Sequence, residues 1–177
     1  MVKSGASHLF LLMCLLNSRG LIASVIEYNS MSTYTIKPLV TATAISTGGR
    51  NGHSETTDHS VSVNLSVPKA MGGPGLPNTT TPEHLFSTGY AACFGGALEF
   101  VASQHKKSVA GTKVTCNTSV GPREGGGFGI AVKMQVHVPT LSTEEARALV
   151  QEAHEKICPY SHATRGNIDF VLEVEGA

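Results

Sequence analysis

A single apolar stretch, residues 82–102, sets the strongest limit on how this 177-residue chain can fold. Thr80 and Glu83 have the spacing of a capping box, and Pro82 stands where a first helical turn tolerates proline. A run of mostly apolar or small residues follows, and Lys106 and Lys107 come at the end where the helix dipole favours positive charge. This pattern predicts one long helix around which the other elements must pack.

One face of the predicted helix carries residues at spacings of three and four. They are Phe86, Tyr90, Cys93, Ala97 and Val101. Cys93 therefore lies on the side that is expected to be buried, and a core cysteine is its plainest interpretation. The stretch is barely long enough to span a membrane and contains Glu99, so we discount a membrane span.

A second segment, near the C-terminus, places another cysteine directly after a predicted helix. Ser142 and Glu145 form a second capping box, and an apolar stripe covers about residues 143–157. Pro159 is expected to end that helix, so Cys158 stands at its C-terminal end.

Alternating apolar and polar residues predict strands on both sides of the long helix. The alternation covers about residues 61–67, 114–120, 130–138 and 168–174, and residues 33–47 are also rich in strand-forming residues. Glycine-rich turns at residues 48–52 and 121–127 predict two hairpins. One-faced strands that flank helices predict one α+β domain, residues 31–177, with antiparallel or mixed β-sheets.

The charge and cysteine content exclude several classes of protein. The formal net charge is zero and only 15% of the residues are charged, which leaves no basic surface for nucleic acid or for a membrane. The four cysteines include no C-x-x-C pair and no zinc spacing, so we predict neither a disulfide scaffold nor a metal site. His154 and His162 lie near Cys158 in the sequence, but no further ligand converges on them.

Residues 1–30 differ from the rest of the chain. Lys3 precedes an apolar run, residues 8–16, that has the character of a signal peptide but is too short to span a bilayer. We predict an N-terminal extension that is disordered, a weak targeting segment, or sequence ahead of a true start at Met31. We assign no role to Cys14. The protein is expected in the cytoplasm, or in mitochondria if residues 1–30 are a targeting segment.

Two motifs resemble those of the OsmC/Ohr family, and in particular its organic hydroperoxide resistance (Ohr) branch. They are P-E-x-L-F-x-x-G-Y-A-A-C-F at residues 82–94 and C-P-Y-S-x-A-T-R-G-N-I-D at residues 158–169. Both motifs are long and specific, and the resemblance covers about residues 31–175. The sequence departs from the family pattern at His162, where the family has Asn, and in the extra Cys116 and N-terminal extension.

This resemblance implies an intertwined homodimer, with sheets wrapped around long central helices and active sites at the subunit interface. It implies a cysteine-based peroxidase in which Cys93 attacks the peroxide and Cys158 resolves the product as a Cys93–Cys158 disulfide. The family's arginine and glutamate correspond to Arg50 and Glu83. The reaction needs no cofactor, and the reductant that the family implies is an external dithiol, with the lipoyl groups of lipoylated proteins favoured.

Thiol chemistry explains why these residue types are needed. A thiolate cleaves the O–O bond of a peroxide and becomes a sulfenic acid, which a second thiol captures. A guanidinium lowers a thiol pKa, which suits Arg50, although by itself such an arginine is usually only solvated and Glu83 could be only a cap. Ten residues of unbroken helix would separate Glu83 from Cys93 by about 15 Å. We therefore predict a break near residues 87–89, with Gly89 as the pivot.

An apolar lining is predicted for the substrate pocket. Its candidate residues are Phe86, Tyr90, Phe94 and Met71, the last in the loop of residues 71–75. Such a lining would favour alkyl or fatty-acid hydroperoxides over hydrogen peroxide, because an organic tail gains burial energy. Ordinary core packing explains each aromatic residue equally well.

Two other functions stay open at this point. The same fold could act as a non-enzymatic module that binds hydrophobic ligands or senses redox state. A cysteine hydrolase would need a base aimed at the nucleophile, and His84 is the nearest candidate in the sequence. We predict that Cys116 is structural, and that Arg165 and Asp169 fix the loop after Cys158.

Overall fold

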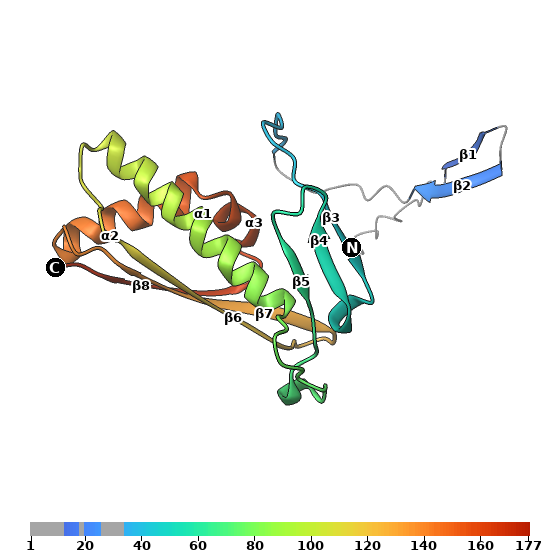
Figure 1. Cartoon of the computed structure of the whole chain (residues 1–177). Coiled ribbons are helices and arrows are strands. Elements are labelled where there is room, and N and C mark those ends of the chain that lie inside the picture. Colours follow the sequence, from blue (N-terminus) through green and yellow to red (C-terminus); the bar gives the residue numbers. More distant parts are fainter. Residues whose placement is uncertain (1–12, 18–19, 26–33) are drawn as a thin grey trace, which may run out of the picture. The chain divides into compact units, whose positions relative to one another are not determined.

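The computed structural model describes residues 13–17, 20–25 and 34–177 of the chain. The chain divides into two compact units, residues 1–41 and 42–177. In the first unit, β1 (Met13–Asn17) and β2 (Gly20–Val25) pair as an antiparallel hairpin (Figure 1). Most of the extension predicted over residues 1–30 lies outside the described residues, so its targeting role stays a prediction.

The second unit is built on α1 (Pro82–Gln104), the long helix that the sequence predicts. Its N-cap is Thr81, whose hydroxyl accepts a hydrogen bond from the His84 N–H, so the prediction of Thr80 as the cap was wrong by one residue. Thr80 instead pairs with Leu65 in an isolated β-bridge. The extended backbone therefore continues one residue closer to the helix than the capping-box spacing indicated.

Helix α1 runs without a break, so the predicted reversal near residues 87–89 was wrong. Gly89 is helical, and its small size serves close packing, because a Cβ atom there would lie 3.0 Å from the Tyr160 hydroxyl. Among the helices that the structure describes, α1 alone has the length and composition of a membrane span. A core helix of a soluble domain passes the same test, and Phe94 and Leu98 of α1 lie in the hydrophobic core.

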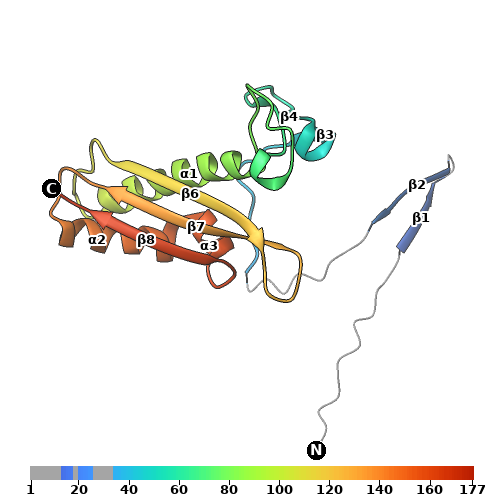
Figure 2. The same cartoon turned by 90° about the horizontal axis from the view of Figure 1, so that it is seen from below.

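Three strands form a mixed sheet, and helices α1 and α2 pack on one of its faces (Figure 2). The strands are β6 (Lys113–Pro122), β7 (Phe128–His137) and β8 (Asp169–Glu175), in that order across the sheet. β6 and β7 form the predicted antiparallel hairpin, and β8 runs parallel to β7. Period-two alternation buries Met134 in the core and exposes its neighbours Lys133 and Gln135.

Helix α2 (Thr143–Glu152) begins with the predicted capping box of Ser142 and Glu145. It continues into η3 (Ala153–Ile157), a turn of π-helix, and the Cys158 N–H donates to the Ala153 carbonyl at 2.9 Å. Pro159 then begins the short helix α3 (Pro159–Thr164), so it starts a helix as well as ending one. Cys158 is the one residue between these two helical segments, and its position depends on both.

A smaller antiparallel sheet precedes α1 in the chain. It consists of β3 (Ala44–Thr47), β4 (His53–Thr56) and β5 (Ser62–Asn64), with the short turns η1 (Gly49–Asn51) and η2 (Lys69–Met71) beside it. The hairpin predicted at residues 48–52 is confirmed. Every residue of β3 is exposed, including Ile45, so this sheet leaves apolar surface uncovered within the single chain. The two sheets and their helices confirm the α+β class.

Candidate active site

The structure brings the two cysteines of the sequence motifs into contact. The Cys93 and Cys158 sulfur atoms are 3.7 Å apart, although 65 residues separate them in the chain. Cys93 comes from the middle of α1, where it is half-buried, and Cys158 is fully buried at the start of α3. A disulfide bond requires a sulfur separation of about 2 Å, so a small approach of the two segments would form one.

The surroundings of Cys93 favour the neutral thiol within the single chain. Burial raises the pKa of the Cys93 thiol, and the neighbouring Cys158 sulfur raises it further. One contact acts in the opposite direction, because the backbone N–H of Tyr160 donates a hydrogen bond to the Cys93 sulfur and lowers its pKa. A reactive thiolate at Cys93 therefore needs a further positive charge.

Arg50 and Glu83 form a bidentate ion pair at the N-terminal end of α1. The Arg50 Nη1 and Nη2 atoms donate to the two carboxylate oxygens of Glu83 at 2.9 and 2.6 Å. Arg50 lies in η1 directly after Gly48 and Gly49, whose positive φ angles let the chain turn there. The hydrogen bonds from Arg50 hold the pKa of Glu83 below its usual value, and those to Glu83 raise the pKa of Arg50.

The ion pair and the thiol pair are separate within one chain. Glu83 and Cys93 stand ten residues apart on an unbroken helix, which corresponds to about 15 Å along its axis. The Arg50 guanidinium is held by Glu83, at the far end of that distance. The geometry thus places Arg50 with Glu83 and Cys93 with Cys158, but it does not place Arg50 at Cys93.

The four residues predicted to line a substrate pocket have different surroundings. Tyr90 and Phe94 are fully buried in the core, whereas Phe86 is half-buried and Met71, in η2, is exposed. Sequence reasoning missed Tyr160, whose ring packs against the rings of Phe86 and Tyr90 with centroids 6.0 and 5.5 Å apart. Its place in the second motif, two residues after Cys158, is the signal that could have found it.

Other residues singled out from the sequence lie apart from this chemistry. His84 contacts the Thr81 hydroxyl at the helix cap, about 13 Å along α1 from Cys93, so it is not aimed at that sulfur. Cys116 is half-buried near the Thr118 hydroxyl, and burial raises the pKa of its thiol. Arg165 donates to the backbone carbonyl of His154, as expected of a residue that fixes the segment around Cys158.

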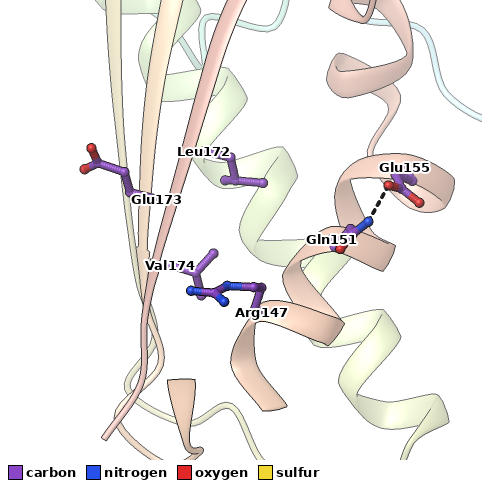
Figure 3. Close-up of a pocket in the computed structure, with 6 residues that line it drawn as sticks. All are labelled: Arg147, Gln151, Glu155, Leu172, Glu173 and Val174. Atoms are coloured by element: carbon purple, nitrogen blue, oxygen red, sulfur yellow. Dashed lines mark hydrogen bonds between the residues drawn. The ribbon is translucent and has the colours of Figure 1, made fainter. Parts of the chain in front are cut away.

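A cavity in the described part of the chain lies apart from the thiol pair and contains neither of its cysteines. It has a volume of about 580 Å³ and lies between α2 and β8, where Arg147 points toward Val174 and Gln151 donates to Glu155 (Figure 3). Within the described residues, no three His, Cys, Asp or Glu side chains gather as a metal site requires.

We predict that the Arg50–Glu83 pair makes the unfolding free energy of the protein fall at acidic pH. Because the folded state lowers the Glu83 pKa, the pair stabilises the protein above the unfolded pKa, and this contribution is lost as the pH falls through the folded value. Glu83→Gln should lower the unfolding free energy at pH 7 by about 1 kcal/mol, since Arg50 is partly exposed, and should flatten its dependence on pH. Urea titrations between pH 3 and pH 7 would measure this.

The control for that measurement is Glu124→Gln, in the exposed turn between β6 and β7. It should leave both the unfolding free energy and its slope with pH unchanged. Equal behaviour of the two variants would show that the ion pair adds nothing to stability.

Comparisons with known proteins agree with the motifs and the fold. A family model described as OsmC-like protein matches residues 73–173. The organic hydroperoxide resistance protein of Xanthomonas axonopodis pv. citri is 47% identical over 137 residues, covering 77% of this chain and 94% of that protein. The crystal structure of the organic hydroperoxide resistance protein OhrB of Bacillus subtilis has a TM-score of 0.71 at 42% identity, covering 78% of this chain and all of that one. Since the model matches more than half of the chain and these relatives align over nearly their whole length, this chain belongs to the OsmC/Ohr family, in its organic hydroperoxide resistance branch.

Proposed function

We propose that this protein is a thiol-dependent peroxidase that reduces organic hydroperoxides to alcohols and so gives resistance to oxidative stress. The observation that carries the proposal is the 3.7 Å contact between the Cys93 and Cys158 sulfur atoms. Two thiols so close can cycle between reduced and disulfide forms with little movement. The relatives are named organic hydroperoxide resistance proteins, and this supports the class of substrate.

The reaction proceeds in two steps at sulfur. The Cys93 thiolate attacks the terminal oxygen of the hydroperoxide, the O–O bond breaks, and the departing alkoxide takes a proton to leave as the alcohol. Cys93 is then a sulfenic acid. The Cys158 thiolate attacks that sulfur, hydroxide leaves and becomes water, and the Cys93–Cys158 disulfide forms.

An external dithiol returns the pair to its reduced form by thiol–disulfide exchange, and no bound cofactor takes part. We propose the lipoyl group of a lipoylated protein as this dithiol.

We infer that Arg50 of a second copy of the chain supplies the cation for Cys93. Glu83, which binds the chain's own Arg50, lies about 15 Å from Cys93 along the axis of the unbroken helix α1. The Arg50 side chain is 39% exposed even with Glu83 bound, so part of the guanidinium is open to a neighbouring subunit. Ala92 and Gly96, four residues apart on α1, are also exposed and leave room for close approach of another helix. The proposed assembly is therefore a homodimer.

The apolar surface near the thiols favours an organic substrate. Phe86 and Tyr160 are partly exposed beside the buried Tyr90, so they form an aromatic surface next to the segment that carries Cys158. An alkyl tail that covers such surface gains about 25 cal/mol for each Å² removed from water, which hydrogen peroxide cannot gain. We propose that Phe86 and Tyr160 contact this tail, with Met71 as a further contact, while Tyr90 and Phe94 support them from the core.

Stopped-flow oxidation of the reduced protein by cumene hydroperoxide and by hydrogen peroxide tests the proposed activity. The wild-type protein should react much faster with the organic peroxide. Cys93→Ser should abolish the reaction, and Cys158→Ser should undergo the first oxidation but accumulate sulfenic or over-oxidised Cys93. Arg50→Ala should slow the first step on the order of a hundredfold, because it removes the group that stabilises the thiolate and the departing oxygen.

Two variants provide matched controls. Cys116→Ser removes a thiol outside the pair, and Arg123→Ala removes an exposed arginine from the β6–β7 turn, so both should react as the wild type does. Slow and equal reaction of the wild type with both peroxides would indicate that Cys93 is only a core cysteine, and it would favour a non-enzymatic binding module.

Mixed dimers would show which subunit provides the arginine. Alone, the Arg50→Ala chain should react on the order of a hundredfold more slowly than the wild type, and the Cys93→Ser chain should not react. If Arg50 acts on the partner's cysteine, a refolded equal mixture should recover about one quarter of wild-type activity, because about half of the dimers are mixed and each contains one complete site. No recovery would mean that Arg50 acts on the Cys93 of its own chain.

A further inference from the structure

A buried set of hydrogen bonds links the two segments that carry the cysteines. The Tyr90 hydroxyl lies 3.0 Å from the Ser161 hydroxyl and 3.1 Å from the Thr164 hydroxyl. The Ser161 hydroxyl also lies 3.1 Å from Nδ1 of His154. Tyr90 and Ser161 are fully buried and Thr164 is 8% exposed, so these polar groups have little access to water. We call Tyr90, His154, Ser161 and Thr164 the hydroxyl–imidazole network.

The direction of each bond in this network follows from its last acceptor. The Thr164 hydroxyl donates to the Tyr160 carbonyl at 2.8 Å, and a carbonyl can only accept. Thr164 therefore accepts from Tyr90, which leaves the Tyr90 oxygen to accept from Ser161, and the Ser161 oxygen to accept from His154. Burial lowers the pKa of His154, which favours the neutral ring with a single N–H group. Because Nδ1 donates to Ser161 in this network, that hydrogen is on Nδ1.

The network ends on the residue that touches the reactive sulfur. Its final acceptor is the carbonyl of Tyr160, and the N–H of the same residue donates to the Cys93 sulfur. Tyr160 is two residues after Cys158, within the first turn of α3. A change in the network would therefore shift the start of α3, and with it both the Cys158 sulfur and the N–H bound to Cys93.

The other end of the network is also fixed in place. The His154 ring stacks on Phe170 of β8, with centroids 4.6 Å apart and the planes inclined by 21°. Arg165 donates to the His154 carbonyl. His154 lies in η3, the π-helical turn that ends at Cys158, and such turns are often found at functional sites. The network thus spans the segments before and after Cys158 and joins both to α1.

We propose that His154, Ser161 and Tyr90 are positioning residues for the resolving step, holding the Cys158 sulfur against Cys93 so that the sulfenic acid is captured before a second peroxide oxidises it. This inference rests on the proposed peroxidase function. Sulfenic acid that is not captured proceeds to sulfinic acid, which a dithiol does not reduce. The network would thereby set the peroxide concentration at which Cys93 becomes over-oxidised, whereas the rate of the first attack would depend mainly on the cation at Cys93.

Substitutions in the network should separate the two steps. Ser161→Ala and His154→Leu break the chain of hydrogen bonds, whereas His154→Asn keeps an N–H donor close to the position of Nδ1. We expect Ser161→Ala and His154→Leu to form the disulfide about tenfold more slowly, because small misplacements of reacting groups cost large factors in rate. The rate of first oxidation by cumene hydroperoxide should change much less, because only one of the groups at Cys93, the Tyr160 N–H, moves with the network. Sulfinic acid at Cys93, measured by mass spectrometry, should rise accordingly, and His154→Asn should restore the wild-type ratio of disulfide to sulfinic acid.

The rate of disulfide formation with diamide provides a second measurement that needs no peroxidase activity. It should fall in Ser161→Ala and His154→Leu and recover in His154→Asn. If the wild type consumes no peroxide while this pattern holds, the proposed function fails and the positioning role stands. If wild type and all variants form the disulfide at one rate and give the same amount of sulfinic acid, the positioning role is overturned. Should Ser161→Ala fail to fold, the His154→Leu and His154→Asn pair decides, because His154 is only half-buried.

Discussion

The contact between the Cys93 and Cys158 sulfur atoms depends on how closely α1 can approach α3. Gly89 permits this approach, because any side chain there would meet the Tyr160 ring. The same closeness buries Tyr90 and requires partners for its hydroxyl, which Ser161 and Thr164 of α3 supply. The packing of Gly89 on Tyr160, the hydrogen bonds of the Tyr90 hydroxyl and the contact between the two sulfur atoms therefore all depend on the same contact between α1 and α3. A change in the packing or in the hydrogen bonds would alter the distance between the two thiols.

The unbroken length of α1 sets a second constraint, an electrostatic one. Burial raises the pKa of Cys93, and within the same chain the backbone N–H of Tyr160 lowers it. The arginine that could hold the thiolate is bound to Glu83 at the start of the helix, and Glu83 lies about 15 Å from Cys93 along the helix axis. A single chain thus contains the parts of the proposed thiol peroxidase without assembling them, and a symmetric dimer would assemble them by combining the ends of two chains. Burial of the exposed apolar surface of β3 against a second chain would also stabilise such a dimer.

Local patterns predicted those parts of the fold that depend on local physics. The alternation of β6 and β7, the capping box of α2 and the length of α1 all follow from side-chain periodicity and cap chemistry. The supposed break at Gly89 was wrong because the prediction required Arg50 and Cys93 to meet within one chain, whereas the glycine serves packing against Tyr160. The cap at Thr81 rather than Thr80 depends on a bridge to Leu65, a contact with another part of the fold. The hydroxyl–imidazole network was missed because its members come from three segments whose proximity exists only after folding.

The most direct test of the central claim is the stoichiometry of one turnover. Reduced protein mixed with less than one equivalent of cumene hydroperoxide, with no external reductant, should yield one cumyl alcohol for each peroxide consumed. Two thiols should be lost for each alcohol formed, and peptide mapping should find them joined as Cys93–Cys158, with Cys116 still free. Alcohol formed without loss of these two thiols, or formed equally by Cys93→Ser, would contradict the assignment of the sulfur pair as the site of peroxide reduction.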